Sequence, residues 1–379
     1  MKYYMIAGEA SGDLHGSNLI RAMHSLDEAL EVRCWGGDKM QAAGATLVKH
    51  YRDLAFMGFV EVVMHLRTIF KNLDDCKADI LSYQPDALIL IDYPGFNLRM
   101  AKWAKTQGIK VIYYISPQVW AWKESRVPAM KKSIDKMLVI LPFEKPYFKN
   151  KFNWEVDYVG HPLVGAIKAF KNNPASHSLP ENLESALEGK KIIAVLPGSR
   201  KQEIAKKLPI MLKMAQHFAD YQFVVAQAPS LDPGYYEPFL SPYPNVMAVT
   251  GKTYALLMRA KAALVTSGTA TLETALFKVP EVVCYKGSAI SYQIARRLIK
   301  VKFISLVNLI MDRLIVRELI QDDLNEQNLK TALKSLLEDP AASVQLQKDY
   351  KDLEDILSAG GDASLNAARA IRQFTSHKP

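Results

Sequence analysis

The chain of 379 residues is longer than a typical single hydrophobic core, so we expect two domains. Hydrophobic residues make up 49% of it and charged residues 23%, which is typical of globular proteins and excludes a disordered chain. The formal net charge of +9 favours an anionic partner such as nucleic acid, an anionic membrane or a phosphorylated ligand, whereas a solvated surface is the simpler interpretation of any single basic cluster.

Residues 2–7 form the first predicted element, a short apolar strand. GEASGD follows it directly, whereas a signal peptide needs a longer apolar segment and a small-residue cleavage site. Other apolar runs, such as DALILIDY and KIIAVLP, are also strand-length and fall short of the ~18 residues of a membrane-spanning helix. The three cysteines are isolated from one another, which predicts neither disulfides nor metal ligation and suits the cytoplasm.

Strand-like and helix-like segments alternate along the whole chain, which predicts parallel sheets covered by helices on both faces. The first unit is predicted to contain strands at residues 2–7, 31–35, 86–91, 110–115, 137–141 and 156–159, and the second at residues 191–196, 222–226, 245–249, 262–266 and 281–284. The polar segment 170–191 is the best candidate for a linker. The expected fold class is therefore α/β, with two doubly wound, Rossmann-like domains facing across a cleft.

Ligands of open α/β sheets bind beyond the carboxyl ends of the strands, so the strand-to-helix turns are the candidate sites. In the first turn, Gly8 and Gly12 bracket Glu9 and Ser11. Glycines there allow tight turning and close approach of a ligand. The turn lacks the spacing of a dinucleotide site or a P-loop, and a plain tight turn is an equally good interpretation.

Residues 56–70, FMGFVEVVMHLRTIF, contain apolar residues spaced to lie on one helical face. A buried core helix is the ordinary interpretation. The apolar surface is wider than one buried stripe requires, however, and beside the basic excess it also fits a surface that meets lipid or an acyl chain. Its residues are Phe59, Val62, Val63, Leu66, Ile69 and Phe70.

Asp92 follows the apolar strand LILI, where a carboxylate is costly unless it faces a cleft or has a partner. Pro94 and Gly95 end the strand, and Asn97 suits the start of the next helix. Two interpretations are about equally supported. Asp92 is either a general base at the carboxyl end of a strand or a structural residue that binds the amides of the turn.

The strand KIIAVL leads into a turn with features of a phosphate site. Gly198 and Ser199 are followed by Arg200, which opens the next helix. A cation at a helix start opposes the helix dipole, so a bound anion explains this arginine better than solvent does. Backbone amides and a guanidinium together suit a diphosphate.

The strand AALVT ends in a similar turn, with Ser267, Gly268 and Thr269 at the start of a helix. Their amides and hydroxyls again suit phosphate, and the carboxylate of Glu273, about one turn into the helix, suits the hydroxyls of a ribose. Ordinary helix capping explains each turn alone. Two such turns in one predicted domain, opposite the turn of Asp92 in the other, favour an enzyme that uses a nucleotide diphosphate.

The chain resembles the lipid-A-disaccharide synthases in the order and spacing of its motifs. These are GEASGD, MGFVEV, IDYPGFN, SPQVWAWKESR, LPFE, VGHPL, LPGSR and TSGTATLE, and the similarity extends from residue 7 to about residue 320. The family belongs to glycosyltransferase family 19 and has a GT-B-type fold. The resemblance implies that UDP-2,3-diacylglucosamine and 2,3-diacylglucosamine 1-phosphate are condensed, with inversion, to the β-1,6-linked lipid A disaccharide 1-phosphate and UDP.

By position in these motifs, the resemblance implies that Asp92 is the essential aspartate and Arg200 the essential arginine. The implied donor and UDP-binding residues are Gly198, Ser199, Arg200, Ser267, Gly268, Thr269, Glu273, Asn308 and Gln321. The implied acceptor-side loop consists of Glu9, Ser11 and Gly12, and the implied membrane surface is the apolar face of residues 56–70. Gly95 stands where some members carry an acidic residue, and Trp120 and Trp122 match without an assignable role.

The resemblance also implies a domain for each substrate. We expect an N-terminal acceptor and membrane domain at residues 1–165, a C-terminal donor domain at residues 166–345, and a helical segment at residues 346–379 that packs back toward the first domain. No cofactor is expected, because the UDP-sugar is a substrate. No metal is expected either, because the sequence shows no paired-carboxylate metal motif and GT-B enzymes generally work without a bound divalent ion. The implied partners are the two acylated sugars and the anionic cytoplasmic face of the inner membrane, and a homodimer is left open.

In the expected mechanism Asp92 takes the proton of the acceptor 6-hydroxyl, while Arg200 and residues 267–270 stabilise the departing UDP. A UDP-sugar 2-epimerase is one rival, disfavoured by the lipid-type surface and by the lack of a second acid in the first domain. A nucleotide-binding membrane adaptor is another, and it would not need Asp92. Nucleic-acid binding has only the net charge in its favour.

Overall fold

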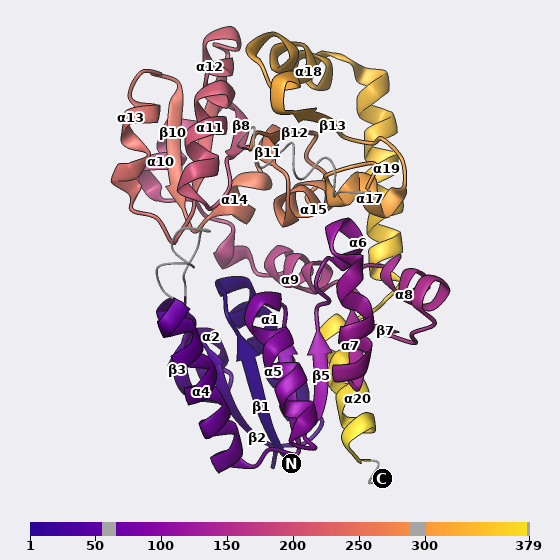
Figure 1. The fold of residues 1–379 in the computed structure, drawn as a ribbon. Helices are drawn as coiled ribbons and strands as arrows, with labels where there is room; N and C mark the ends of the chain where they lie inside the picture. The colour runs from indigo at the N-terminus through magenta and orange to yellow at the C-terminus, as the bar shows by residue number, and fades with distance from the viewer. Residues whose placement is uncertain (55–65, 288–300, 377–379) are drawn as a thin grey trace. The chain divides into compact units, whose positions relative to one another are not determined.

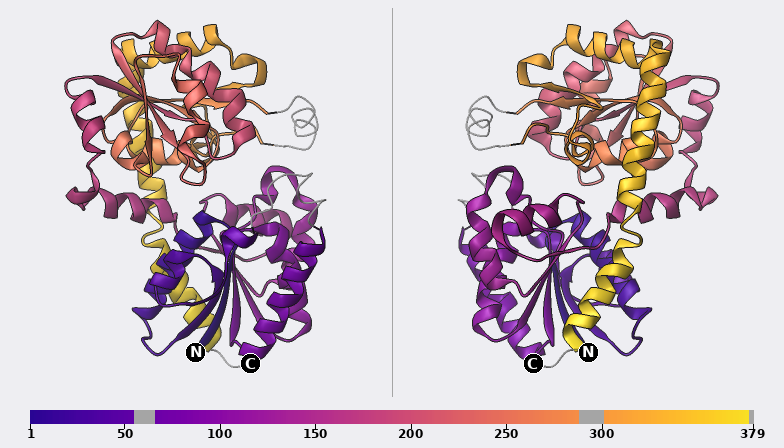
Figure 2. Two further views of the ribbon diagram at one scale, coloured as in Figure 1. Left: turned by 90° about the vertical axis from the view of Figure 1, so that its left-hand side faces the viewer. Right: turned by 90° about the vertical axis from the view of Figure 1, so that its right-hand side faces the viewer.

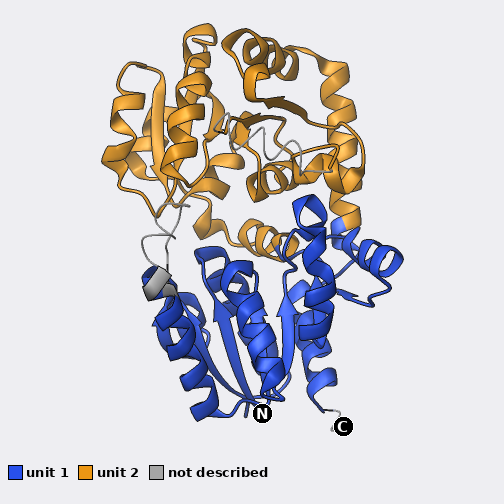
Figure 3. Ribbon diagram, in the orientation of Figure 1, with its two compact units in different colours: residues 1–162, 357–379 blue, residues 163–356 orange. Residues whose placement is uncertain are grey.

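The structure, a computed structural model, describes residues 1–54, 66–287 and 301–376. The chain divides into two compact units, one formed by Met1–Pro162 with Leu357–Pro379 and the other by Leu163–Ile356 (Figure 3). Each unit is built on one parallel sheet.

The first unit contains a seven-stranded parallel sheet in the order β3-β2-β1-β4-β5-β6-β7 (Figure 1). Its strands are β1 (Lys2–Ala7), β2 (Glu31–Gly36), β3 (Thr46–His50), β4 (Ala87–Ile91), β5 (Lys110–Tyr114), β6 (Lys136–Val139) and β7 (Asp157–Tyr158). Successive side chains point to opposite faces of the sheet, so Tyr3 and Met5 of β1 join one core while Tyr4 and Ile6 join the other. Both faces are therefore buried, as is usual for parallel sheets.

Helices from both ends of the chain cover this sheet. On the face of Tyr3 lie α1 (Ala10–His24), α2 (Asp38–Ala42) and α20 (Ala363–Ser376), and on the other lie α4 (Leu66–Tyr83), α5 (Pro94–Thr106), α7 (Val127–Ser133) and α8 (Glu144–Phe152). Shorter helical segments are η1 (Tyr51–Leu54), α6 (Val119–Trp122) and η2 (Glu124–Arg126). Helix α20 packs beside α1 (Figure 2), and the hydroxyls of Tyr3 and Thr375 are 2.9 Å apart. The C-terminal helix thus belongs to the core of the first unit.

The second unit contains a six-stranded parallel sheet in the order β10-β9-β8-β11-β12-β13. Its strands are β8 (Lys191–Leu196), β9 (Tyr221–Gln227), β10 (Val246–Thr250), β11 (Ala260–Thr266), β12 (Glu281–Tyr285) and β13 (Arg317–Ile320). Its helices are α9 (Pro162–Lys171), α10 (Glu181–Leu187), α11 (Lys201–Leu212), α12 (Met214–His217), α13 (Glu237–Leu240), α14 (Thr253–Leu257), α15 (Thr269–Leu276), α17 (Leu306–Met311), α18 (Glu326–Glu338) and α19 (Pro340–Ser358), with 3-10 turns η3 (Pro174–Ser176), η4 (Pro233–Tyr235) and η5 (Gln321–Asp323). Apolar residues of α11, α12 and α18 pack on one face of the sheet.

The predicted α/β class with two doubly wound parallel sheets is confirmed, and each predicted strand overlaps an observed one. Strands β3 and β13, which lie at sheet edges, had no counterpart in the prediction. The segment 170–191, predicted as a linker, instead contains η3 and α10 and lies inside the second unit, because the units divide after Pro162 and again after Ile356. Within the described ranges, no helix has the length and apolar character needed to cross a membrane.

Candidate active site

The four turns singled out in the sequence fall, in pairs, at the topological switch points of the two sheets. In the first sheet β1 lies between β2 and β4, so the strand order reverses at β1 and β4, and these strands are followed by Glu9 and Asp92. In the second sheet the order reverses at β8 and β11, which are followed by Arg200 and Ser267. The carboxyl ends of strands at a switch point are the usual ligand sites of such sheets.

The backbone at Asp92 is held in an unusual conformation. Asp92 and Tyr93 both have left-handed φ angles, of 44° and 48°, a conformation that is costly for residues with a side chain and persists only when neighbours enforce it. The carbonyl oxygen of Asp92 accepts hydrogen bonds from Tyr113 Oη at 2.6 Å and Asn97 Nδ2 at 2.8 Å, and its amide donates to Tyr114 O at 3.1 Å. Three hydrogen bonds therefore fix the main chain of Asp92.

The environment of Asp92 favours proton uptake. Burial raises the pKa of the Asp92 carboxyl to about 6, the charge of Glu9 raises it further, and a hydrogen bond to the backbone of Tyr93 opposes the shift. A carboxylate with a pKa near the working pH is well suited to act as a general base. Gly8 completes the turn, because a Cβ at this position would lie 2.3 Å from the ring of Tyr93.

Another buried carboxyl of the same unit, Glu144, was not predicted from the sequence. Its Oε1 accepts a hydrogen bond from Trp120 Nε1 at 3.3 Å, and its Oε2 accepts one from the amide of Leu141 at 2.9 Å. Burial raises the pKa of Glu144 to about 7, and the charge of Asp92 adds to the shift. The first domain therefore contains a second acid, contrary to the prediction, and Trp120 is its hydrogen-bond partner.

The three residues of the acceptor-side loop have different positions. Glu9 and Ser11 are exposed at the turn and at the start of α1. Gly12 is buried, and a Cβ there would lie 3.1 Å from the Cβ of Ala7, so this glycine allows α1 to pack closely on β1. Gly12 lies on the side of α1 that packs on β1. Of the three residues, Glu9 and Ser11 are therefore the ones available to a ligand.

Around Arg200, the turn after β8 and the start of α11 bring together three charged side chains. Gly198 has a φ of 102°, and Arg200 is exposed and forms an ion pair with Glu203 at 3.1 Å. The other oxygen of Glu203 lies 3.4 Å from the ammonium of Lys207, which also donates a hydrogen bond to Thr266 Oγ1. Lys207 is buried, and burial lowers its pKa. This buried cation beneath the predicted phosphate turns was not predicted from the sequence.

The start of α15 offers free backbone donors. Gly268 precedes the helix with a φ of 143°, and no described residue accepts a hydrogen bond from the amide of Thr269 or Ala270. The hydroxyl of Ser267 is used elsewhere, since it donates to Ile304 O at 2.8 Å. The amides, together with the helix dipole, are thus the groups available to an anion at this turn.

Glu273 lies at a pocket of about 390 Å³ within the second unit. The pocket is lined by Phe170, Ser176, Gly251, Lys252, Thr253, Tyr254, Ala255 and Glu273. Tyr254 Oη donates to Glu273 Oε1 at 3.1 Å, which leaves the second carboxylate oxygen available to a ligand. Burial raises the pKa of Glu273. An aromatic and polar pocket of this volume is suited to a nucleoside.

Asn308 has its side-chain amide fully occupied within the chain. Nδ2 donates to Val316 O at 2.8 Å and to Glu318 Oε1 at 2.9 Å, while Oδ1 accepts from the amides of Ile315 and Val316. These bonds hold the segment between α17 and β13. Asn308 therefore serves as a positioning residue in this structure, with no donor left for a nucleotide.

Gln321, the other nucleotide position implied by the resemblance, has a free donor. It follows β13 with a left-handed φ of 55°, and its Oε1 accepts from the amide of Gly287 at 3.1 Å. Its Nε2 is buried and has no hydrogen-bond partner among the described residues. A buried amide without a partner is costly, so this group is suited to a ligand.

The predicted membrane surface is only partly described. Phe59, Val62 and Val63 lie outside the described residues, while Leu66 and Ile69 belong to the first turns of α4. Phe70, also in α4, has 58% of its surface exposed. Elsewhere in the described ranges, no group of acidic, histidine or cysteine side chains is arranged to hold a metal ion.

Comparisons with known proteins identify the family of the chain. The family described as lipid-A-disaccharide synthetase matches residues 3–373. The lipid-A-disaccharide synthase of Syntrophus aciditrophicus is 38% identical over 373 residues, covering 97% of this chain and 96% of the relative, and that of Geobacter sulfurreducens is 37% identical over 365 residues, covering 94% and 93%.

Solved structures share the fold. The UDP-GlcNAc 2-epimerase of Neisseria meningitidis bound to UDP-GlcNAc matches with a TM-score of 0.68 at 13% identity, covering 99% of each chain. The glycosyltransferase of kitacinnamycin matches with a TM-score of 0.67 at 16% identity, covering 98% of each chain. At these identities the likeness concerns the fold alone, which is that of GT-B epimerases and glycosyltransferases.

Proposed function

This chain belongs to the lipid-A-disaccharide synthetase family, and we propose that Asp92 activates the acceptor while the turns of the second unit bind the donor. The enzyme is a glycosyltransferase of lipid A biosynthesis. In the proposed reaction, the 6-hydroxyl of 2,3-diacylglucosamine 1-phosphate attacks C1 of the UDP-linked 2,3-diacylglucosamine. The bond between C1 and the UDP oxygen breaks as the β-1,6 bond forms, and the products are the disaccharide 1-phosphate and UDP.

The position and environment of Asp92 carry the proposal. Its carboxyl has a pKa of about 6, so it is ionised at neutral pH and still basic enough to take the hydroxyl proton as the new bond forms. Asn97 and Tyr113 hold its main chain through the carbonyl oxygen, and the backbone of Tyr93 forms a hydrogen bond with the carboxyl group. Such pre-positioning lowers the barrier because the base need not reorganise during the reaction.

For the donor, we assign the diphosphate to the turns after β8 and β11. Arg200 supplies an exposed guanidinium, and Thr269 and Ala270 supply amides that no described residue occupies. Positive charge and oriented amides stabilise the negative charge that develops on UDP as it leaves. UDP is a good leaving group once so stabilised, and no proton donor is required on that side.

The pocket at Glu273 is assigned to the nucleoside. The free oxygen of Glu273 suits the ribose hydroxyls, and the rings of Phe170 and Tyr254 provide apolar surface for a base. Gln321, whose amide donor has no partner among the described residues, is assigned to the nucleotide or its sugar. Asn308 supports this side of the unit indirectly by holding the segment before β13.

Because both substrates carry acyl chains, the enzyme is proposed to bind the anionic cytoplasmic face of the inner membrane without spanning it. The apolar residues from Phe59 to Phe70 supply burial, and the net charge of +9 supplies attraction to anionic lipid at about 1 kcal/mol for each basic residue near the surface. Exposed Phe70 belongs to this surface.

The direct test is incubation of the purified enzyme with both acylated sugars, followed by mass spectrometry of the lipid product and measurement of UDP. We expect the disaccharide 1-phosphate and UDP in equal amounts, and neither without the acceptor. UDP-GlcNAc alone is the control for the epimerase alternative. Conversion of UDP-GlcNAc to its 2-epimer, with no disaccharide from the acylated sugars, would overturn the proposed function.

A further inference from the structure

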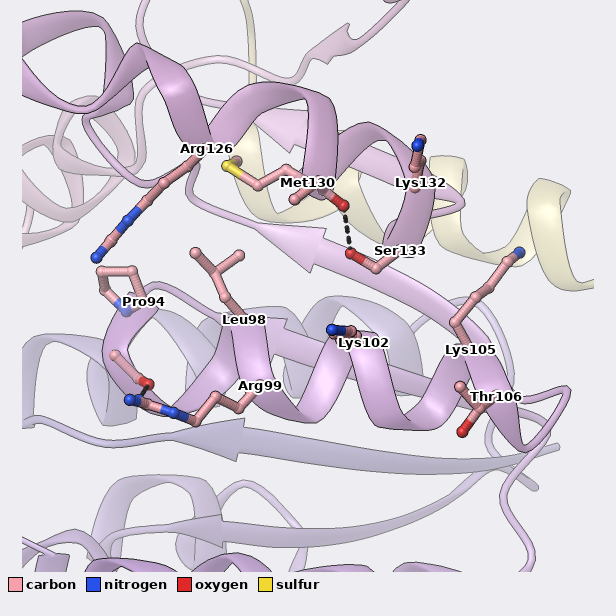
Figure 4. Close-up of a pocket in the computed structure, with 12 residues that line it drawn as sticks. Pro94, Leu98, Arg99, Lys102, Lys105, Thr106, Arg126, Met130, Lys132 and Ser133 are labelled. Carbon is pink, nitrogen blue, oxygen red and sulfur yellow. Dashed lines mark hydrogen bonds between the residues drawn. The ribbon is translucent and has the colours of Figure 1, made fainter. Parts of the chain in front are cut away.

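A groove runs between two helices of the first unit and begins beside the catalytic turn. It lies between α5 and the segment formed by residues 126–133, and its volume is about 630 Å³ (Figure 4). Pro94 and Gly95, at one end of the groove, follow Asp92 by two and three residues. Helix α5, which forms one wall, has 13 residues and is therefore about 20 Å long. All of it lies within one compact unit.

The floor of this groove is apolar. Leu98 on α5 points toward Met130 on α7 across the gap between the helices (Figure 4). Ala129 also lines the groove. Met130 is buried and belongs to the core beneath, while Leu98 is half-buried. The groove thus exposes a strip of apolar surface to solvent, and covering such a strip is favourable by roughly 25 cal/mol for each Å².

The rim of the groove is strongly cationic. Its lining side chains include Arg99, Lys102, Lys105, Arg126 and Lys132, and no carboxylate is among them. Lys105 is paired with Asp135, and Arg99 donates to the carbonyl of Gly95. For Lys102, Arg126 and Lys132, no described carboxylate oxygen lies within 4.0 Å of the side-chain nitrogens. The rim therefore carries positive charge that the described residues leave uncompensated.

Arg126 connects this rim to the catalytic turn. Its side chain extends over Pro94 at the end of the groove nearest Asp92 (Figure 4). Both charges also act on one hydroxyl, because Asp92 raises and Arg126 lowers the pKa of Tyr113, whose Oη donates to Asp92 O at 2.6 Å. A ligand that contacts Arg126 would therefore lie at the end of the groove that adjoins the turn of Asp92.

We propose that this groove binds the acceptor sugar, with an acyl chain along the floor between Leu98 and Met130 and the 1-phosphate on Arg126 and its neighbouring lysines. The inference rests on the proposed function, since it assigns a place to one of its substrates. An apolar floor with a cationic rim matches a molecule that has both a hydrocarbon chain and a phosphate monoester. The donor, in contrast, carries its phosphates on the nucleotide, which we assign to the second unit.

A membrane phospholipid has similar chemistry, but the continuity of the groove with the turn of Asp92 favours the acceptor. A docking site for bulk lipid has no need to end at the general base. The acceptor must place its 6-hydroxyl there, and a groove that starts at Pro94 gives its chain and its phosphate a binding surface next to that point.

Binding of the acceptor can be measured without turnover. The probes are 2,3-diacylglucosamine 1-phosphate in detergent micelles and the same sugar without its phosphate, each titrated calorimetrically into wild type and into Arg126→Gln. We expect Arg126→Gln to weaken binding of the phosphorylated sugar by about tenfold or more and to change binding of the other by less than about twofold. Leu98→Asn should weaken both probes alike, because both carry the acyl chains.

Two controls keep the test specific. Lys149→Gln removes an exposed cation of the same unit that forms its ion pair with Glu155 outside the groove, and it should leave both affinities unchanged. UDP affinity should be the same in all variants, which shows that they are folded. These titrations measure acceptor binding, whereas the product assay measures the reaction. A wrong assignment of the groove can therefore be distinguished from a wrong proposed reaction.

Equal affinities of wild type and Arg126→Gln for the phosphorylated sugar would overturn the proposal. So would a loss confined to vesicles of phosphatidylglycerol, with acceptor binding in micelles unchanged, since that result would make the groove a site for membrane lipid.

Discussion

The buried ammonium of Lys207 donates a hydrogen bond to Thr266 Oγ1, the last side chain of β11. Lys207 belongs to α11, which follows β8, so this bond joins the helix after one switch-point strand of the second sheet to the end of the other. A Cβ at Gly198 would lie only 3.7 Å from the same ammonium. A positive charge is thus fixed between the two turns assigned to the diphosphate.

Replacing Lys207 by methionine should weaken UDP binding by about tenfold, because the site loses a fixed charge near the phosphates. Isothermal titration with UDP measures the change. Lys206→Met, one residue earlier on the exposed side of α11, is the matched control and should bind UDP as wild type does. An unchanged UDP affinity in Lys207→Met, with an altered melting temperature, would make Lys207 a purely structural residue.

The acid limb of the pH profile of kcat/KM should report the ionisation of the Asp92 carboxyl. The pKa of its carboxyl is about 6, and protonation below that pH removes the base, so kcat/KM should fall as the pH drops through this value. Glu9→Gln removes one of the two causes that raise this pKa, so the limb should move to lower pH. Burial remains and keeps the pKa above the usual value for aspartate.

The matched control for this shift is Glu31→Gln, an exposed carboxylate at the start of β2, which should leave the limb in place. If the acid limb of Glu9→Gln stays at the wild-type pH or moves to higher pH, the charge of Glu9 does not raise the pKa that the limb reports. That result would contradict the prediction.

Buried Glu281 is predicted to destabilise the protein at neutral and alkaline pH. Both its carboxylate oxygens are buried and lack a hydrogen-bond partner among the described residues, and burial raises its pKa well above the usual range. The folded state therefore holds the proton more tightly than the unfolded state. Stability is fully present below the unfolded pKa of about 4.3 and declines as the pH rises above it.

Glu281→Gln removes this titration, so it should raise the melting temperature more at pH 8 than at pH 5, as measured by calorimetry. Exposed Glu338→Gln, in the last turn of α18, should raise it at neither pH. A melting temperature of Glu281→Gln equal to or below that of wild type at pH 8 would refute the explanation.

The membrane surface is tested by the triple variant Val62→Ser, Val63→Ser and Leu66→Ser. If these residues meet lipid, the variant should no longer sediment with anionic vesicles while keeping its melting temperature, since it loses apolar burial only in the bound state. Loss of folding in the same variant would support the alternative of a buried core helix.

Much of the fold was visible in the sequence because parallel strands buried on both faces are continuous apolar runs, as in the LILI before Asp92. The two strands that were missed, β3 and β13, are edge strands with the sequences TLVKH and RELI. An edge strand pairs on one side only and carries polar residues, so its pattern does not stand out.

The candidate site was predictable where local sequence determines it. Asp92 directly follows an apolar strand, and Arg200 opens a helix, and a charge of that sign is unexpected at each of these places. Glu144 stands at the start of α8, where a carboxylate is ordinary, and only its burial against Trp120 distinguishes it. Lys207 is one of three lysines in α11, and burial alone separates it from the others. The groove between α5 and α7 depends on long-range packing that no local pattern encodes.

The central claim is that Asp92 is the general base, and the turnover of Asp92→Asn tests it most directly. Asparagine keeps the size of the side chain and leaves the main-chain bonds from Asn97 and Tyr113 in place, so only the basic group is lost. We expect kcat to fall by about 10²–10⁴-fold while the affinity for UDP stays at the wild-type value. A variant that binds UDP normally and still turns over within about threefold of wild type would contradict the account.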